Sequence, residues 1–178
     1  MNIKQNLTTV NFRENGNTSR IKYIVVHYTA GKSDYEGAAH DNTKYFKSEN
    51  RNASAHYFVD CGDTIWQCVE DKHVAWHCGG GLQGSGGHTF YQKCTNSNSI
   101  GIEMVSYYSG GQYYIKEQTL RNTAELVREL MKKYGIPIER VIRHYDVTGK
   151  ACPKYFVDYE EKWEQFHEDV QAALEIIK

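Results

Sequence analysis

A continuous apolar segment near the N-terminus constrains the fold of this chain more than any other feature. Lys22 to Tyr28 carries the apolar run Tyr-Ile-Val-Val and then His27. Such a strand is typical of the centre of a sheet that is covered on both faces. The segment from Ser99 to Val105 alternates instead, which predicts a second inner strand. Its apolar face would carry Ile100, Ile102 and Met104, and its other face Gly101 and Glu103.

Helical periodicity supplies the elements that would cover this sheet. Glu117 to Tyr134 is predicted to be a helix that ends at Lys132-Lys133, Gly135 and Pro137. Further helices are predicted over 37–48 and 159–177, and a short strand over 140–143. A hairpin is predicted from Ala55–Val59 and Thr64–Val69. The inward residues would be Leu120, Ala124, Val127, Leu130 and Met131 in the 117–134 helix, and Trp163, Phe166, Val170 and Leu174 in the last one.

These elements indicate one α/β domain with a central mixed β-sheet flanked by α-helices. At 178 residues the chain is long enough to bury a substantial core. We expect residues 1–20 to form an extended arm or loop and residues 21–178 to form the domain. The glycine-rich stretch 79–87 is predicted to be a mobile surface loop near a site.

Composition and charge exclude several classes of function. The net charge of −1 argues against nucleic-acid binding. No apolar run approaches the roughly 20 residues needed to span a bilayer, so we expect no membrane insertion. We see no signal peptide, and therefore expect synthesis in the cytoplasm. The five cysteines are expected to be reduced and mostly buried, and a monomer is expected.

A candidate metal site comes from three residues that are far apart in the sequence. The segment from His144 to Pro153 holds a histidine, a lysine and a cysteine, and its Gly and Pro favour a loop. Catalytic zinc usually takes three protein ligands and leaves one position for water. His27 closes one predicted strand, as His144 closes another, and strand ends at one sheet edge converge. His27, His144 and Cys152 are therefore candidate zinc ligands, although a histidine at the end of a strand can also be a satisfied core residue.

Two charged residues are candidate catalytic groups. Glu103 lies between apolar neighbours in an inner strand, where an unpaired carboxylate is costly. It could form a salt bridge, or it could act as a general base with a raised pKa. Lys150 could be an ordinary exposed loop lysine. Its position between His144 and Cys152 favours stabilisation of an oxyanion instead.

Five motifs occur in the order found in one family. They are Val25-Val26-His27-Tyr28-Thr29, Ser54-Ala55-His56-Tyr57, Ala75-Trp76-His77, Ser99-Ile100-Gly101-Ile102-Glu103, and His144-Tyr145-Asp146 with Lys150 and Cys152-Pro153. From about Ile21 to Val157 the chain resembles the zinc-dependent N-acetylmuramoyl-L-alanine amidases of the second type. That group includes phage lysozyme-like amidases and peptidoglycan recognition proteins.

The resemblance implies a function and a set of roles. It implies hydrolysis of the amide between N-acetylmuramic acid and L-alanine in peptidoglycan, as the catalytic domain of a phage or prophage endolysin that lyses the wall after release. His27, His144 and Cys152 would bind one Zn²⁺, with Glu103 as general base and Lys150 at the oxyanion. His56 or Tyr57 would face the zinc, and Trp76 and His77 would line the groove. The alternatives are a cytosolic amidase that recycles soluble muropeptides, a non-catalytic peptidoglycan-binding protein and a structural zinc protein.

Overall fold

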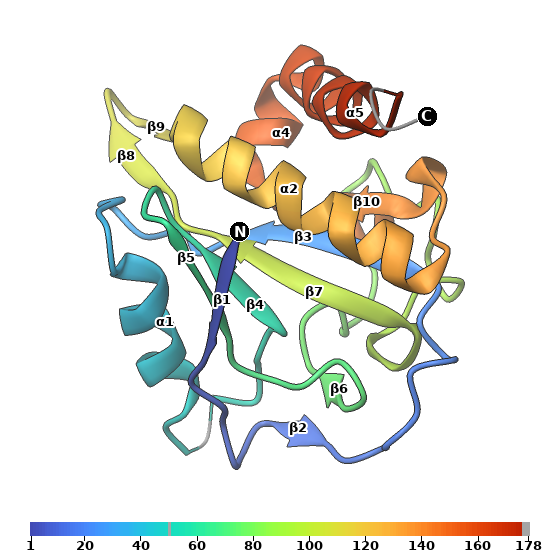
Figure 1. The fold of residues 1–178 in the computed structure, drawn as a ribbon. Coiled ribbons are helices and arrows are strands. Elements are labelled where there is room, and N and C mark those ends of the chain that lie inside the picture. The colour runs from blue at the N-terminus through green and yellow to red at the C-terminus, as the bar shows by residue number, and fades with distance from the viewer. Residues whose placement is uncertain (50, 176–178) are drawn as a thin grey trace.

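Six strands form one mixed sheet in the order β1, β5, β4, β7, β3, β10 (Figure 1). The structure is a computed structural model that describes residues 1–49 and 51–175, with side chains to residue 172. The pairs β1–β5, β4–β7, β7–β3 and β3–β10 are parallel, and β4–β5 is antiparallel. The predicted mixed α/β architecture is therefore confirmed. The strands are β1 Asn2–Gln5, β3 Tyr23–Tyr28, β4 Tyr57–Val59, β5 Thr64–Gln67, β7 Ser99–Met104 and β10 Val141–Arg143.

Two helices form layers over one face of the sheet. α2 (Glu117–Tyr134) packs on β4 and β7, and α5 (Glu160–Glu175) packs on α2 (Figure 1). α2 ends where the sequence predicts, because Gly135 adopts the left-handed conformation (φ 63°) and its N–H donates to the Met131 carbonyl. The core between sheet and helices includes Val26, Ile102, Ala124, Val127, Leu130, Phe156, Trp163, Phe166 and Val170. The side chain of Leu174, which was also expected to point inward, lies outside the described residues.

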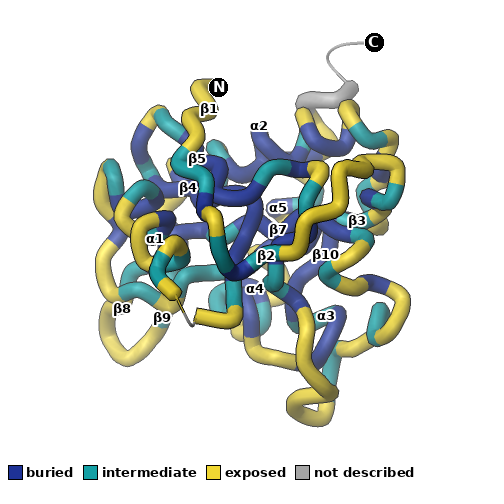
Figure 2. Tube along the Cα trace, turned by 90° about the horizontal axis from the view of Figure 1, so that it is seen from below, coloured by how far each residue is buried: buried dark blue, intermediate teal, exposed yellow. Residues whose placement is uncertain are grey.

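The opposite face of the sheet is covered by shorter elements. α1 (Ala38–Phe46) packs on β4 and β5, and it forms a second apolar cluster with Phe58 and Cys68. Two small sheets complete the fold, β2 (Phe12–Arg13) with β6 (Val74–Ala75), and β8 (Tyr107–Ser109) with β9 (Gln112–Tyr114). Short 3-10 turns cover Asn96–Asn98 and Ile138–Arg140. Figure 2 shows the buried strands in the middle, with exposed segments around them.

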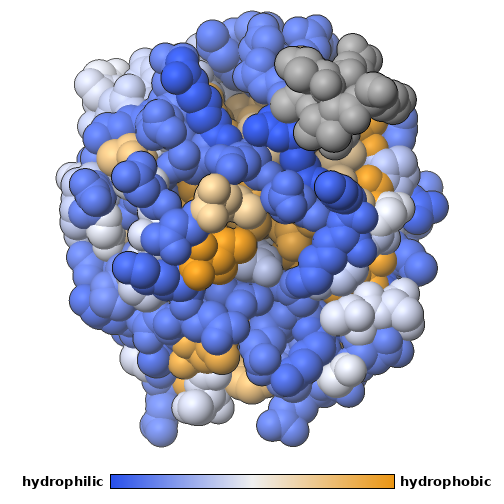
Figure 3. Space-filling model, viewed as in Figure 1, coloured by the Kyte–Doolittle hydropathy of each residue, from blue (hydrophilic) through white to orange (hydrophobic). Residues whose placement is uncertain are grey.

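Two short strands lie within the first 20 residues, for which an extended arm or loop is expected. β1 pairs along its length with β5, and the Met1 ammonium lies 3.2 Å from Glu125 Oε1. All four residues of β1 are exposed, so this edge strand lacks the apolar pattern from which a strand could be predicted. The face drawn in Figure 3 is largely hydrophilic and has a small apolar patch in this region, where Met1 and Ile3 are exposed.

The segment 144–158 is more helical than the sequence predicts. Its first residues form α3 (His144–Thr148), and α4 (Lys154–Asp158) follows Pro153. Helices of five residues are too short to show a period, which explains why a loop was expected. All five cysteines are free thiols, of which only Cys61 is not buried. Among the helices described, none is both long and apolar enough to cross a membrane.

Candidate metal centre

Three candidate ligands, brought from distant parts of the sequence, meet beside the β3–β10 edge. His27 lies near the end of β3, and His144 directly follows β10. Because the two strands are parallel and Val26 pairs with Arg143, these histidines leave the sheet side by side. One ligand atom each from His27, His144 and Cys152 lies within 4.8 Å of the other two, and all three side chains are buried. The structure thus brings together the three residues that the sequence singled out.

An ion-pair network holds the start of α3, and with it His144. The backbone N–H of Arg143 donates to Asp146 Oδ2 at 2.8 Å, which caps the first turn. The buried Arg143 guanidinium contacts Asp146 and Glu160 and donates to the Phe156 carbonyl. Burial alone would lower the pKa of Arg143, but the bonds to Asp146 and Glu160 outweigh it, so the charge is retained. This network could not be predicted from the sequence, because its parts come from four separate elements, β10, α3, α4 and α5.

The backbone also closes the loop that carries Cys152. The N–H of Tyr145 donates to the Cys152 carbonyl at 2.9 Å. Gly149 ends α3 with φ 81°, and a β-carbon there would lie 2.0 Å from the carbonyl oxygen of Gln83. The glycine-rich stretch 79–87 therefore packs against the loop that carries Cys152. Its predicted place near the site is confirmed, whereas its mobility stays a prediction.

The donor set fits a metal ion such as zinc. Both ring nitrogens of His144 are buried and have no hydrogen-bond partner in the part of the chain described, which is costly unless something else binds them. Burial, together with the Lys150 charge, lowers the pKa of His144 to about 3, so the ring is neutral and can ligate. Burial and the nearby Glu103 raise the pKa of the Cys152 thiol to about 12. An incoming cation would therefore displace a proton from Cys152.

Glu103 lies directly beside this cluster. Its partner in the β3–β7 register is His27. Oε2 of Glu103 is buried without a hydrogen-bond partner, and no ion pair of this residue occurs within the described ranges. Burial raises the pKa of Glu103 to about 8, although the charge of the exposed Lys150 opposes this rise. The salt-bridge alternative is therefore not what the structure shows.

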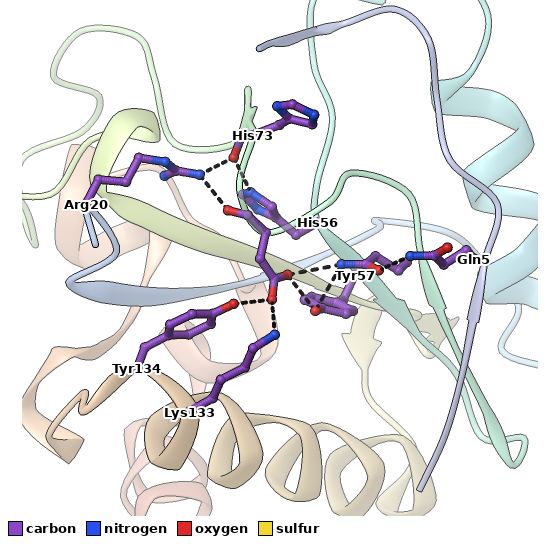
Figure 4. A network of polar contacts seen from close by, with 9 residues as sticks. Gln5, Arg20, His56, Tyr57, His73, Lys133 and Tyr134 are labelled. Atoms are coloured by element: carbon purple, nitrogen blue, oxygen red, sulfur yellow. Dashed lines mark hydrogen bonds and ion pairs between the residues drawn. The ribbon is translucent and has the colours of Figure 1, made fainter. Parts of the chain in front are cut away.

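The sequence predicts that either His56 or Tyr57 faces the zinc. In the structure these two side chains lie on opposite faces of the sheet. Tyr57 pairs with Ile102 and points into the core below α2, where its hydroxyl donates to Asp71 Oδ1 at 2.6 Å. The expectation that it could face the cluster is wrong for Tyr57, because side chains alternate along a strand. The His56 side chain lies on the other face of the sheet, and both of its ring nitrogens have backbone partners. Its Nδ1 accepts from the Gly101 N–H, and its Nε2 contacts the His73 carbonyl at 3.2 Å (Figure 4).

His77 contacts the candidate ligand His27 directly, and its place along a substrate groove stays a prediction. Its Nδ1 is 3.0 Å from His27 Nε2, and its Nε2 is 3.1 Å from Ser99 Oγ. The neighbouring Trp76 is half-buried, and its backbone exchanges two hydrogen bonds with Ser54. Ser99 was missed from the sequence. The signal was present, because the alternation that places Glu103 and Gly101 on one face of β7 places Ser99 there as well.

Comparison with known proteins agrees with this geometry. The family profile of the N-acetylmuramoyl-L-alanine amidases matches residues 17–155. The chain belongs to this family. The resemblance that the five motifs indicate is thereby confirmed.

Individual amidases of this family show how far the similarity extends. The chain is 35% identical over 158 residues to a probable N-acetylmuramoyl-L-alanine amidase of Bacillus licheniformis, covering 86% of this chain and 42% of that one. It is 32% identical to the amidase CwlA of Bacillus subtilis, covering 89% and 52%. The chain therefore spans about half, or less, of the length of these relatives.

Solved structures confirm the fold. The catalytic domain of XlyA matches with a TM-score of 0.73 and 27% identity, covering 96% of this chain and 99% of the other. The structure of PlyL matches with the same score and identity, covering 96% and 97%.

Proposed function

We propose that this chain hydrolyses the amide bond between N-acetylmuramic acid and L-alanine in peptidoglycan, with one zinc ion held by His27, His144 and Cys152. We further propose that it acts as the catalytic domain of a phage or prophage endolysin. The observation that carries the proposal is the buried group of two imidazoles and one thiol with an unpartnered carboxylate beside it. Membership of the amidase family supports the choice of bond.

The arrangement suits a metal-assisted hydrolysis. A zinc ion in this site would supply Lewis-acid chemistry, polarising the scissile carbonyl and activating water. Three protein ligands are typical of catalytic zinc, whereas structural sites have four. The ligand set therefore favours a catalytic centre over a structural zinc protein, and over a binding protein that lacks activity.

Two of the chain's own residues would carry out the proton transfer and charge stabilisation. Glu103, with a pKa raised to about 8 by burial, can both accept and release a proton near neutral pH. It would take the proton of the attacking water and pass it to the leaving amine. Lys150 is exposed and close enough for its charge to act on Glu103 and His144, and its ammonium would stabilise the developing oxyanion. Trp76 stays a candidate for the groove that binds the substrate.

The test is digestion of purified peptidoglycan by the zinc-loaded protein, followed by assay of new chain ends. We expect new N-terminal alanine without new reducing sugar. Cys152→Ser should lose both zinc and activity, because a hydroxyl is a poor zinc ligand. Glu103→Gln should keep zinc and lose about 10²–10⁴-fold in rate, the usual contribution of a general base.

Other outcomes would select the alternatives. Cleavage of soluble muropeptides but not of intact walls would favour a recycling amidase. Binding to walls without any new chain ends would indicate a peptidoglycan-binding protein, and the amidase proposal would be withdrawn. Full zinc content and full rate in Cys152→Ser would show that the ligand set is wrong.

A further inference from the structure

The two ring nitrogens of His27 face different neighbours. Nδ1 is 3.7 Å from Cys152 Sγ, and therefore faces the candidate ligands. Nε2 is 3.0 Å from His77 Nδ1 on the other side. A neutral imidazole carries one proton, and only the nitrogen without it can bind a metal. The position of this proton therefore decides whether His27 can act as a ligand in the observed geometry.

A chain of hydrogen bonds fixes that position, starting from a backbone carbonyl. The Thr95 carbonyl can only accept, so Ser99 Oγ, at 2.6 Å, donates its single proton there. The contact of 3.1 Å between Ser99 Oγ and His77 Nε2 must then be donated by His77. His77 Nδ1 is left as an acceptor, and His27 Nε2 donates to it. The lone pair of His27 Nδ1 consequently points toward Cys152.

The ring of His77 is held in place from several sides. Its backbone N–H and that of Cys78 both donate to Asn96 Oδ1, at 3.0 and 2.8 Å. Under the ring lies Gly101, where a β-carbon would be 2.5 Å from His77 Cγ. Only glycine leaves room for the ring at this position of β7. The contact with His27 is therefore part of a rigid arrangement, unlike the contact of a side chain free to rotate in a groove.

We propose that His77 and Ser99 are positioning residues that hold His27 in the tautomer with the proton on Nε2, so that Nδ1 is available to the metal. This inference rests on the proposed function, because it assigns a role toward the same metal site. Partners of this kind orient metal-binding histidines, and their loss typically weakens metal affinity by about 10–100-fold. Here a second histidine, itself oriented by a serine, takes the place of the usual carboxylate or carbonyl.

A matched pair of variants separates this role from simple packing. In His77→Asn the amide oxygen can occupy the place of Nδ1 and accept from His27. Leucine has nearly the same shape as asparagine but offers no acceptor. We expect the zinc dissociation constant, measured by competition with a chromophoric chelator, to rise about 10–100-fold in His77→Leu and to stay within about threefold of the wild type in His77→Asn. Circular dichroism and thermal unfolding verify that both variants fold.

A spectroscopic measurement reads the tautomer directly. Nitrogen-15 histidine spectra of the zinc-free protein should show His27 protonated on Nε2. His77→Leu should show a mixture of tautomers, and Ser99→Ala a shift in the same direction. A wild-type His27 protonated on Nδ1, or equal zinc affinities for the Asn and Leu variants, would overturn the inference.

The two proposals fail in different ways. The zinc titration and the tautomer spectra need no peptidoglycan, so they stand even if the protein cleaves no wall. If the wild-type protein binds no zinc, the proposed function loses its metal. The spectra of the zinc-free protein then still decide whether His77 sets the tautomer of His27.

Discussion

Replacing Asp71 by asparagine should destabilise the fold without affecting the candidate metal centre. The Asp71 carboxylate is buried, and four donors from β4, β5 and α2 converge on it; Figure 4 labels three of them, Tyr57, Lys133 and Tyr134. Tyr57 Oη and Gln67 Nε2 donate to Oδ1 at 2.6 and 3.1 Å. Lys133 Nζ lies 2.9 Å from Oδ2, to which the Tyr134 hydroxyl also donates. An amide at this place keeps the shape but lacks the charge, and its NH₂ group would face donors.

The contacts of Asp71 differ in how much they contribute to the free energy of unfolding. A hydrogen bond to a buried charged group is worth about 1.5–3 kcal/mol, so Tyr57→Phe should lower the free energy of unfolding by about that amount. The Lys133 side chain is 59% exposed, and an ion pair of this kind contributes about 0–1 kcal/mol. Lys133→Met should therefore be nearly neutral. Asp71→Asn, which weakens all four contacts, should cost about 2–4 kcal/mol.

Urea unfolding followed by circular dichroism at neutral pH measures these differences. Burial alone would raise the pKa of Asp71, but the hydrogen bonds from Tyr134, Tyr57 and Lys133 outweigh it and hold the pKa below its usual value. The stabilisation is therefore complete above the unfolded pKa of about 3.9, and it is lost as the pH falls through the lower folded pKa. The difference in the free energy of unfolding between the wild type and Asp71→Asn should therefore become smaller below about pH 4.

The relative losses in stability of two variants, Lys133→Met and Tyr57→Phe, could refute this reasoning. If Lys133→Met costs more than Tyr57→Phe, the ion pair and not the buried hydrogen bonds holds β5 and α2 together. Zinc affinity serves as the control, because Tyr57, which donates to Asp71, lies on the face of the sheet opposite His27. A large loss of zinc affinity in Asp71→Asn would show that the two faces are coupled.

Two further predictions concern the loop between α3 and α4. Lys150→Met should keep its zinc and lose about 10²–10³-fold in turnover, the usual cost of removing an oxyanion donor. Zinc content and steady-state rates test this prediction. An unchanged rate would show that Lys150 is an ordinary surface lysine. Gly149→Ala should lower the free energy of unfolding by about 1–3 kcal/mol, because of its positive φ and the close Gln83 carbonyl. Gly81→Ala is the matched control, since Gly81 has an ordinary φ and no neighbour within 4 Å, and equal stability of the two variants would contradict the prediction.

The elements with strong apolar periodicity could be predicted from the sequence, and the polar edges could not. α2 occupies the range expected for it, and the strands around His27 and Glu103 lie within a residue or two of their predicted bounds. β1 was missed because an exposed edge strand is held by backbone hydrogen bonds, which any side chain permits.

The candidate ligands of the site could be found from the sequence, but its supporting contacts could not. His27 and His144 stand at the ends of predicted strands, and Cys152 lies in the short segment that also holds Lys150, so all three stand out in the sequence. Ser99 and Asn96 are ordinary polar residues, and only their distances to His77 reveal what they do. Tyr57 is a candidate from the sequence that does not face the site. A motif that spans two adjacent residues does not say which of them points toward the site.

The order of strands in the sheet has a consequence for synthesis. The centre of the sheet pairs β3 with β7, which is more than 70 residues further along the chain, and the last strand to be made, β10, immediately precedes His144. Pairings between such distant segments form late and slowly. A nascent chain released from the ribosome before residue 152 lacks one of the three candidate ligands, however well its early strands have folded. A chain built in this way can assemble the proposed metal centre only after residue 152 has been translated, long after its first strands have been made.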